Sequence, residues 1–284
     1  MRKFASILVL VCSLWLRTGA AQNPTAQSPA QASPGATTGA SAAVEDPGSR
    51  KAREIVAEGI RALGGDAYLN IRDREMRGRS STLHHGRQEG VSVLFWSFSE
   101  FPDKERIELT EERDIAYVYL GDKGWEITYK GPHPVEEKDR VEYARQHRYS
   151  LDTVLRTWVK DPGVLFLFEG NALAAQHEAY QVTLINSKDE SVTLYFDTDT
   201  HLPIKKTFTW RDPVDLQKNL EEEIYDNYRP VGGGAVLPYN VTRYFNGDMS
   251  RQRFFFSVTI NQGLDPAMFD PKSDYNPNKP VKKK

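Results

Sequence analysis

Residues 236–260 read VLPYNVTRYFNGDMSRQRFFFSVTI, two runs rich in β-branched and aromatic residues on either side of Asn246-Gly247. Asn-Gly is a strong signal for a two-residue β-hairpin, because both residues tolerate the positive φ angles of a type I′ turn. The stretch therefore predicts two antiparallel strands, over 236–246 and 250–260.

Similar signals recur along most of the chain, where β-branched and aromatic runs are separated by Gly, Pro and Asp breaks. We expect a mainly β (α+β) domain built on a large curved antiparallel sheet, which must cover one of its faces. The remaining predicted strands lie at 72–82, 90–100, 104–110, 113–120, 125–128, 164–169, 179–186, 190–197, 202–211 and 219–228.

Two helical segments are natural covers for that sheet. The first begins at Ser49 as N-cap, ends at Gly64-Gly65 and has apolar residues at helical spacing between them. The second occupies 136–158 and restarts at Ser150. The first stripe comprises Ala52, Ile55, Val56, Gly59, Ile60 and Leu63, and the second Val141, Ala144, Arg148, Leu151, Leu155 and Trp158.

The beginning of the chain predicts export from the cytoplasm. A basic start, an apolar run over 4–16 and small residues before Gln22 are typical of a cleaved secretory signal, here 1–21. Cys12 lies inside the apolar run and follows Val11, which argues against a lipid anchor. We therefore expect a soluble periplasmic protein without cysteine and, after cleavage, without a transmembrane segment.

The amino-acid composition predicts where the folded domain begins and ends. Residues 22–48 are rich in Ala, Pro, Ser, Thr and Gly, which predicts a disordered linker before a domain at 49–272. We expect 273–284 to be a disordered basic tail. The formal net charge of −2 gives no reason to expect a nucleic-acid partner.

Few residues of the sequence stand in a pattern typical of a catalytic or metal-binding site. No nucleophile elbow, phosphate-binding loop or H-E-x-x-H motif occurs. Asp197, Asp199 and His201 alternate and could hold a divalent cation, but Thr198 and Pro203 favour a polar hairpin turn. The sequence thus predicts no metal, no cofactor and no catalytic residue.

The acidic run Glu221-Glu222-Glu223 lies on a predicted strand. Three consecutive carboxylates are expensive to bury without partners. We therefore expect this run to form a solvated face.

Four segments in order resemble the LolA-like group of periplasmic lipoprotein-sorting proteins. They are Ile55–Gly65, Asp197–Pro203, Tyr225–Pro238 and Asn261–Phe269. The resemblance implies an unclosed β-barrel with helices on its concave face, a cavity that accepts acyl chains, and no catalysis. The glycines at 232–234 and the helical block at 136–160 depart from the group's pattern, which leaves the cargo open.

Several strands are apolar on both faces, as in Val91–Phe98. Such a strand is either buried on both sides or lines a hydrophobic cavity on one. The sequence leaves both possibilities open. If a cavity exists, the residues we expect to line it are Phe95, Trp96, Phe98, Tyr117, Tyr119, Trp158, Phe208 and Trp210.

Three functional hypotheses follow. The first is a non-catalytic carrier for a lipid or the acyl chains of a lipoprotein, held in an apolar cavity between sheet and helices. The second is a structural or interaction module of the envelope, with a filled core, an exposed apolar patch and a protein partner. The third is a hydrolase with a dispersed site, which needs a cleft with convergent titratable groups.

Overall fold

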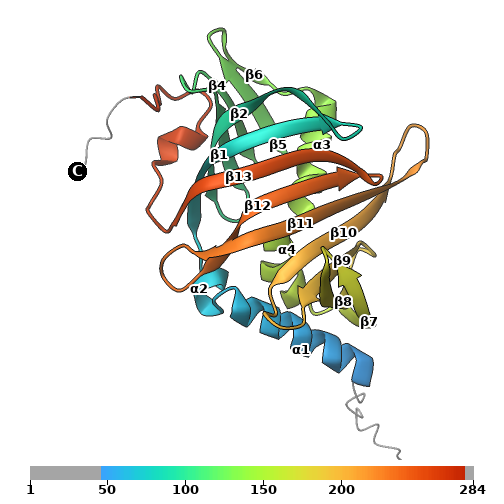
Figure 1. Cartoon of the computed structure of the whole chain (residues 1–284). Coiled ribbons are helices and arrows are strands. Elements are labelled where there is room, and N and C mark those ends of the chain that lie inside the picture. The colour runs from blue at the N-terminus through green and yellow to red at the C-terminus, as the bar shows by residue number, and fades with distance from the viewer. Residues whose placement is uncertain (1–45, 279–284) are drawn as a thin grey trace, which may run out of the picture. The chain divides into compact units, whose positions relative to one another are not determined.

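The computed structural model describes residues 46–278. Within them the chain forms one antiparallel sheet of thirteen strands, in the order β6-β5-β4-β3-β2-β1-β13-β12-β11-β10-β9-β8-β7 (Figure 1). The strands are β1 (Asp73–His84), β2 (Arg87–Glu100), β3 (Lys104–Leu109), β4 (Ile115–Leu120), β5 (Lys123–Thr128), β6 (Gly131–Pro134), β7 (Leu165–Ala174), β8 (His177–Ile185), β9 (Ser191–Asp197), β10 (Pro203–Arg211), β11 (Lys218–Pro230), β12 (Val236–Phe245) and β13 (Asp248–Ile260).

Two meanders make up this sheet, and they join where the first strand pairs with the last. β1 lies between β2 and β13, while β6 and β7 are the free edges. At the join, a Cβ atom on Gly78 would lie 2.3 Å from the carbonyl oxygen of Phe254, so only glycine fits at this bulge. The predicted unclosed sheet is confirmed.

The predicted hairpin at Asn246-Gly247 is also confirmed. β12 and β13 pair up to Phe245 and Asp248, and the two turn residues Asn246 and Gly247 have φ angles of 50° and 87°. The positive φ angles explain why the turn uses these two residue types.

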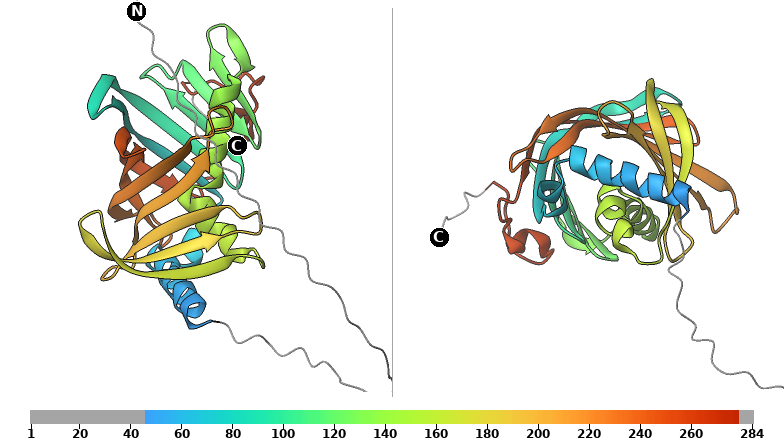
Figure 2. Two further views of the ribbon diagram at one scale, coloured as in Figure 1. Left: turned by 90° about the vertical axis from the view of Figure 1, so that its right-hand side faces the viewer. Right: turned by 90° about the horizontal axis from the view of Figure 1, so that it is seen from below.

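Helices occupy the concave side of the sheet (Figure 2). α1 (Pro47–Ala62) lies over β7, β8 and β9, and its buried residues belong to the predicted apolar stripe. The short helix α2 (Asp66–Leu69) follows it. The N-cap of α1 is Asp46 rather than Ser49: the Asp46 side chain accepts a hydrogen bond from the Ser49 backbone N–H, and proline suits the first helical position.

The second helical segment breaks at Ser150 as predicted. α3 (Glu137–Arg148) precedes it, and α4 (Leu151–Arg156) and the 3₁₀ turn η1 (Trp158–Lys160) follow it. The predicted apolar stripe holds only after the break. α3 buries no residue completely and Val141 is 44% exposed, because this helix meets the sheet through Tyr143, Arg145 and Gln146 and not through the predicted apolar stripe.

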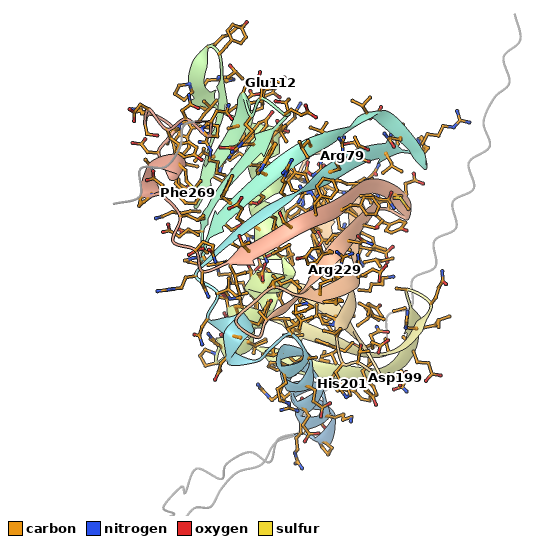
Figure 3. The ribbon with its side chains drawn as sticks, turned by 60° about the vertical axis from the view of Figure 1, so that its left-hand side comes forward. Arg79, Glu112, Asp199, His201, Arg229 and Phe269 are labelled. Atoms are coloured by element: carbon orange, nitrogen blue, oxygen red, sulfur yellow. The ribbon has the colours of Figure 1, made fainter. Side chains whose placement is uncertain are left out.

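Apolar side chains form clusters on both faces of the sheet. The largest cluster lies between α1, α4 and the concave face. A smaller one on the convex face joins Phe98 of β2 to Met268 and Phe269 of the 3₁₀ turn η2 (Pro266–Phe269; Figure 3). Residues after 272, the predicted end of the domain, also contribute to this packing, because Tyr275 packs against the cluster.

Three predicted segments lie wholly or mainly outside the described residues. They are the secretory signal, the linker up to residue 45 and the end of the basic tail from 279. Between 46 and 278, no helix is both long enough and apolar enough to cross a membrane.

Candidate ligand-binding site

The concave face contains a region built from aliphatic and aromatic side chains alone. Ile55 of α1 and Leu155 of α4 are fully buried against Leu184, Leu194 and Phe196 of the sheet. We call these five residues and the buried apolar side chains around them the apolar region. Burying one such side chain stabilises the fold by roughly 1.5–3 kcal/mol.

Close approach of α1 to the sheet explains how this region is sealed. A Cβ atom added to Gly59 would lie 2.2 Å from the ring of Phe196. Glycine at this position therefore lets the helix settle directly on the aromatic ring. The helix and the ring touch through apolar surface, and the nearest polar atom, the backbone oxygen of His201, would lie 3.3 Å from that Cβ atom.

A second part of the concave face is charged and lies beneath α3. Lys206 is 0% exposed; its Nζ lies 2.8 Å from Glu223 Oε2 and donates to the Tyr149 carbonyl at 2.7 Å. Arg243 Nη2 donates to the other Glu223 oxygen at 3.2 Å. We call Lys206, Glu221, Glu223 and Arg243, with the α3 side chains on them, the charged region.

Electrostatics favour the ionised form of Glu223. Burial alone would raise the pKa of this carboxyl, but the charges of Lys206 and Arg243 outweigh burial and hold the pKa well below its ordinary range. Glu223 also accepts a hydrogen bond from the Tyr225 hydroxyl at 2.6 Å. The group is therefore a paired, buried carboxylate.

Glu221 ties α3 to the sheet. Its carboxylate accepts hydrogen bonds from Trp210 Nε1 at 3.0 Å and from the Gln146 amide, and it lies 3.4 Å from Arg145 Nε. The Arg145 guanidinium also stacks 3.6 Å from the centre of the Trp210 ring.

These contacts overturn the predicted solvated face of 221–223. Strand alternation turns Glu221 and Glu223 into the interior, and only Glu222 faces the other way, where it pairs with Lys205. The two inward carboxylates are tolerated because cations from β10, β12 and α3 meet them.

The predicted cavity-lining aromatic residues separate between the two faces. Six lie on the concave side: Phe95, Trp158 and Phe208 in its core, Trp210 on Glu221 and Tyr119 on Tyr143 of α3, and Tyr117 beside Glu126 of β5. Trp96 and Phe98 lie on the convex side, beneath the cluster containing Phe269. The two that face the convex side cannot line a cavity on the concave side, and a cavity lined by the other six stays a prediction.

Sequence reasoning missed the aromatic residue that α3 contributes. Tyr143 stacks on Tyr119 with ring centres 3.5 Å apart and an interplanar angle of 7°. Burial and the charge of Glu105 raise the pKa of Tyr143 far above its ordinary value. The surrounding charges in 137–148 hid this residue, since α3 carries no apolar stripe that would mark an inward face.

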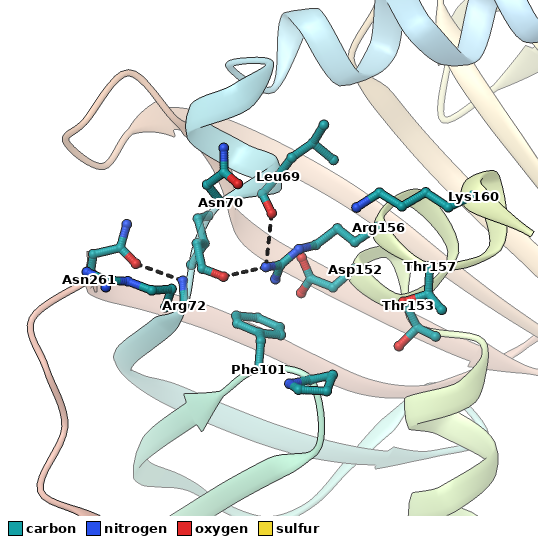
Figure 4. Close-up of a pocket in the computed structure, with 12 residues that line it drawn as sticks. Leu69, Asn70, Arg72, Phe101, Asp152, Thr153, Arg156, Thr157, Lys160 and Asn261 are labelled. Atoms are coloured by element: carbon teal, nitrogen blue, oxygen red, sulfur yellow. Dashed lines mark hydrogen bonds between the residues drawn. The ribbon is translucent and has the colours of Figure 1, made fainter.

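A cavity of about 610 Å³ lies at the border of the apolar region, between α2, the start of β1, Phe101 and α4 (Figure 4). Leu69, Ile71 and Phe101 line it and pack against the apolar core. Its ionisable lining residues are Arg72, Asp152, Arg156 and Lys160. We call this cavity the cationic pocket.

Asp152 is held in the ionised form at the inner wall of this pocket. Burial would raise its pKa, but Arg74 and Arg156 outweigh burial and lower it. Arg74 Nη2 lies 2.9 Å from one carboxylate oxygen, and the Tyr68 hydroxyl donates to the other at 3.1 Å.

Another cavity, of about 410 Å³, lies between α3, α4 and the turn at 186–190, and shares Thr153 and Thr157 with the lining of the cationic pocket. Trp158, Tyr143, His147 and Arg148 are among its lining residues. Trp158 is the one predicted lining residue that borders either of these two cavities.

The candidate metal ligands form a turn. Asp197 Oδ1 accepts hydrogen bonds from the backbone N–H groups of Asp199 at 3.1 Å and Thr200 at 2.7 Å. His201 lies beside α1, 3.8 Å from Glu58 (Figure 3). The polar-turn interpretation is confirmed, and over residues 46–278 no group of three or more His, Cys, Asp or Glu residues could hold a metal ion.

Comparison with known proteins identifies the fold of this chain. No protein-family model and no curated protein sequence matches the chain. Among solved structures, a domain from Vibrio parahaemolyticus classed with outer membrane lipoprotein-sorting proteins aligns at 13% identity and a TM-score of 0.54, over 78% of this chain and 97% of that one. The chain has a LolA-like fold.

Two further structures resemble the LolA-like domain. A DUF1329 family protein from Desulfovibrio piger aligns over 78% of this chain and 97% of its own, at 12% identity and a TM-score of 0.55. A LolA superfamily protein from Nitrosomonas europaea aligns over 74% and 96%, at 13% identity and a TM-score of 0.47. At 12–13% identity, the two structures with TM-scores of 0.54 and 0.55 show the fold alone, and the ligand of the LolA-like domain has to be argued from its own residues.

Proposed function

We propose that this LolA-like domain is a non-catalytic carrier of a lipid or of the acyl chains of a lipoprotein. The observation that supports this proposal is the way in which the concave side is closed. Helices cover the apolar region, whereas the two edge strands β6 and β7 do not meet. The wall over the apolar region is therefore a helix held by side-chain packing, and not by strand pairing.

A wall of this kind opens at low structural cost. α1 lies over β7, β8 and β9. A backbone hydrogen bond from Val236 N to Leu63 O, 2.9 Å long, joins the chain to β12 just after the helix ends. Moving α1 outward exposes the apolar region without breaking a ladder hydrogen bond of the sheet. An acyl chain then replaces the packing that the helix had supplied.

Apolar burial alone supplies enough affinity for such a ligand. Each methylene removed from water contributes about 0.8 kcal/mol, so a long acyl chain gains on the order of 10 kcal/mol before the lost helix contacts are subtracted. The apolar region fits this use because Leu184, Leu194 and Phe196 offer no polar atom that the chain would leave without a partner.

Fold likeness and the predicted export signal support the same proposal. The Vibrio domain of matching fold is classed with outer membrane lipoprotein sorting. A secretory signal at 1–21 would deliver this protein to the periplasm, where acylated cargo crosses between membranes. We propose the periplasm as its place of action and an envelope protein as the donor or acceptor of its cargo.

One observation favours the alternative, an interaction module without ligand. Side chains fill the apolar region, and Phe254 and Phe256 on β13 are 41% and 54% exposed outside it. Exposed aromatic side chains are common anchors of protein interfaces. In that case crosslinking in the envelope captures a protein partner, and the purified protein carries no lipid.

Lipid uptake tests the proposal. Protein purified from the envelope is analysed by native mass spectrometry, then delipidated and titrated with a fluorescent fatty-acyl probe. We expect a co-purified lipid or acylated partner, saturable probe binding, and several-fold weaker binding by Val56→Ser in α1. Val141→Ser in α3 is the matched control, since Val141 is largely exposed. Folded protein that neither carries lipid nor binds the probe would refute the carrier function.

A further inference from the structure

We infer that the cationic pocket binds the anionic headgroup, a phosphate or a carboxylate, of the lipid whose chain the apolar region holds. This inference rests on the proposed carrier function and names the class of its ligand. Three features carry it: an excess of positive charge, an arginine with an unused N–H group, and the position of the pocket at the border of the apolar region.

Charge is the first feature. Arg72, Arg156 and Lys160 line the pocket together with a single carboxylate, that of Asp152. Asp152 is already engaged by Arg74 and Tyr68 from outside the lining. Among the described residues, neither Arg72 nor Lys160 lies in an ion pair with a carboxylate. The lining thus has positive charge to spare for an anion.

The orientation of Arg156 is the second feature. Its Nη2 donates to the carbonyl oxygens of Leu69, at 3.2 Å, and Ile71, and its guanidinium stacks 4.1 Å from the centre of the Phe101 ring (Figure 4). Nη1 is buried and has no hydrogen-bond partner among the residues described. Two carbonyls and a ring therefore fix a guanidinium whose Nη1 lacks an acceptor.

A buried donor without an acceptor is costly, and an oxyanion is its strongest acceptor. Because the guanidinium is already held in place, binding an anion there orders little further chain. Lys160 comes from η1 next to α4 and points its amino group toward Arg156 across the pocket (Figure 4). Both cations can thus meet one ligand oxyanion group.

The third feature is what lies beside the charges. Ile71 is buried in the core that includes the apolar region, and Leu69 and Phe101 pack against that core. An amphiphile with its headgroup at Arg156 would therefore reach the apolar region with its chain. A free inorganic anion would gain binding energy from the charges alone. Because the pocket is open to solvent, salt would screen that electrostatic attraction.

Two lipids that share a chain and differ in headgroup test this inference on the delipidated full chain. The probes are palmitoyl lysophosphatidic acid and palmitoyl lysophosphatidylcholine, with inorganic phosphate as a third titrant. We expect the anionic lipid to bind about tenfold more tightly than the zwitterionic one, and inorganic phosphate to bind far more weakly than either.

Exposed cations provide variants that keep the fold. The double variant Arg72→Gln/Lys160→Gln should lose most of the preference for the anionic lipid while still binding both. Lys218→Gln, at an exposed lysine of β11, should keep the full preference. Arg156→Lys keeps the charge but not the fork of donors, so it should lower the preference as well.

The outcomes separate this inference from the carrier function. Equal affinity of the wild-type protein for both lipids would overturn the headgroup site and leave the carrier function standing. Inorganic phosphate binding as tightly as the anionic lipid would also overturn it, in favour of a free-anion site. Binding of neither lipid would overturn the carrier function itself.

Discussion

The two regions of the concave face bury side chains equally well by opposite means. Phe196 in the apolar region and Lys206 in the charged region are both 0% exposed. Phe196 is held by contact area, which has no preferred direction. Lys206 is held by a carboxylate at 2.8 Å and a carbonyl at 2.7 Å, which fix its position closely.

This difference assigns different roles to the covering helices. α1 contributes a stripe of small and aliphatic residues to the apolar region, and in the proposed function an acyl chain takes its place. α3 reaches the sheet through Arg145, Gln146 and Tyr143, whose partners are specific. We infer that α1 is the helix that yields to a ligand and that α3 stays in place.

The largest expected effect is in the apolar region. Phe196→Ala should destabilise the protein by about 3–5 kcal/mol, because it removes a fully buried ring and leaves a cavity beneath Gly59. Phe256→Ala, at a half-exposed position on the same sheet, should cost about 1 kcal/mol or less. Urea unfolding measures both; equal losses would mean that the apolar region is not a packed core.

The second largest effect on stability is expected in the charged region. Lys206→Met should cost about 3 kcal/mol, because it leaves the Glu223 carboxylate buried with Arg243 as its remaining cation. The double variant Lys206→Met/Glu223→Gln should recover part of that loss, since no uncompensated charge remains. If the double variant is no more stable than Lys206→Met, the pairing account of this region is wrong.

Acid should act on the charged region and not on the apolar region. The folded state lowers the pKa of Glu223, so the unfolded state takes up a proton at higher pH. The stability from this group is therefore complete above about pH 4.5 and is lost as the pH falls below that value. In Glu223→Gln, the free energy of unfolding should fall by about 2 kcal/mol less between neutral and acid pH than in the wild-type protein. Phe196→Ala should lower the free energy of unfolding equally at every pH.

The smallest effect concerns the anchoring of α3. Tyr143→Leu should destabilise the protein by about 1 kcal/mol, through loss of the ring stacked on Tyr119. Hydrogen exchange should become faster in 137–148 and stay unchanged in α1. Val141→Ala, at an exposed position of the same helix, is the control, and faster exchange in α1 as well would contradict independent roles for the two helices.

How much of this was predictable differs between the regions. Asn246-Gly247 and the stripe around Ile55 give the hairpin and α1, because turn chemistry and helical periodicity are local. The inward carboxylates of Glu221 and Glu223 were assigned to solvent. Their partners Lys206, Arg243 and Arg145 come from separate segments, which only tertiary pairing brings together.

The cationic pocket illustrates the same limit. Arg72 precedes β1, Arg156 ends α4 and Lys160 ends η1, so no window of sequence contains them all. The prediction that eight aromatic residues line a cavity rests on their residue type and not on the direction of their side chains. Alternation along β2 then sends Phe95 to the concave side and Trp96 to the convex side, a choice that needs the strand's register.

The central claim is that an acyl chain occupies the apolar region in place of contacts made by α1. A photoactivatable fatty-acyl probe, crosslinked to the delipidated full chain and mapped by peptide mass spectrometry, tests it most directly. The account predicts labels on 47–62, on α4 around Leu155 and on β8 and β9. Labels confined to α3 and the charged region, or to the convex cluster around Phe98 and Phe269, would contradict it.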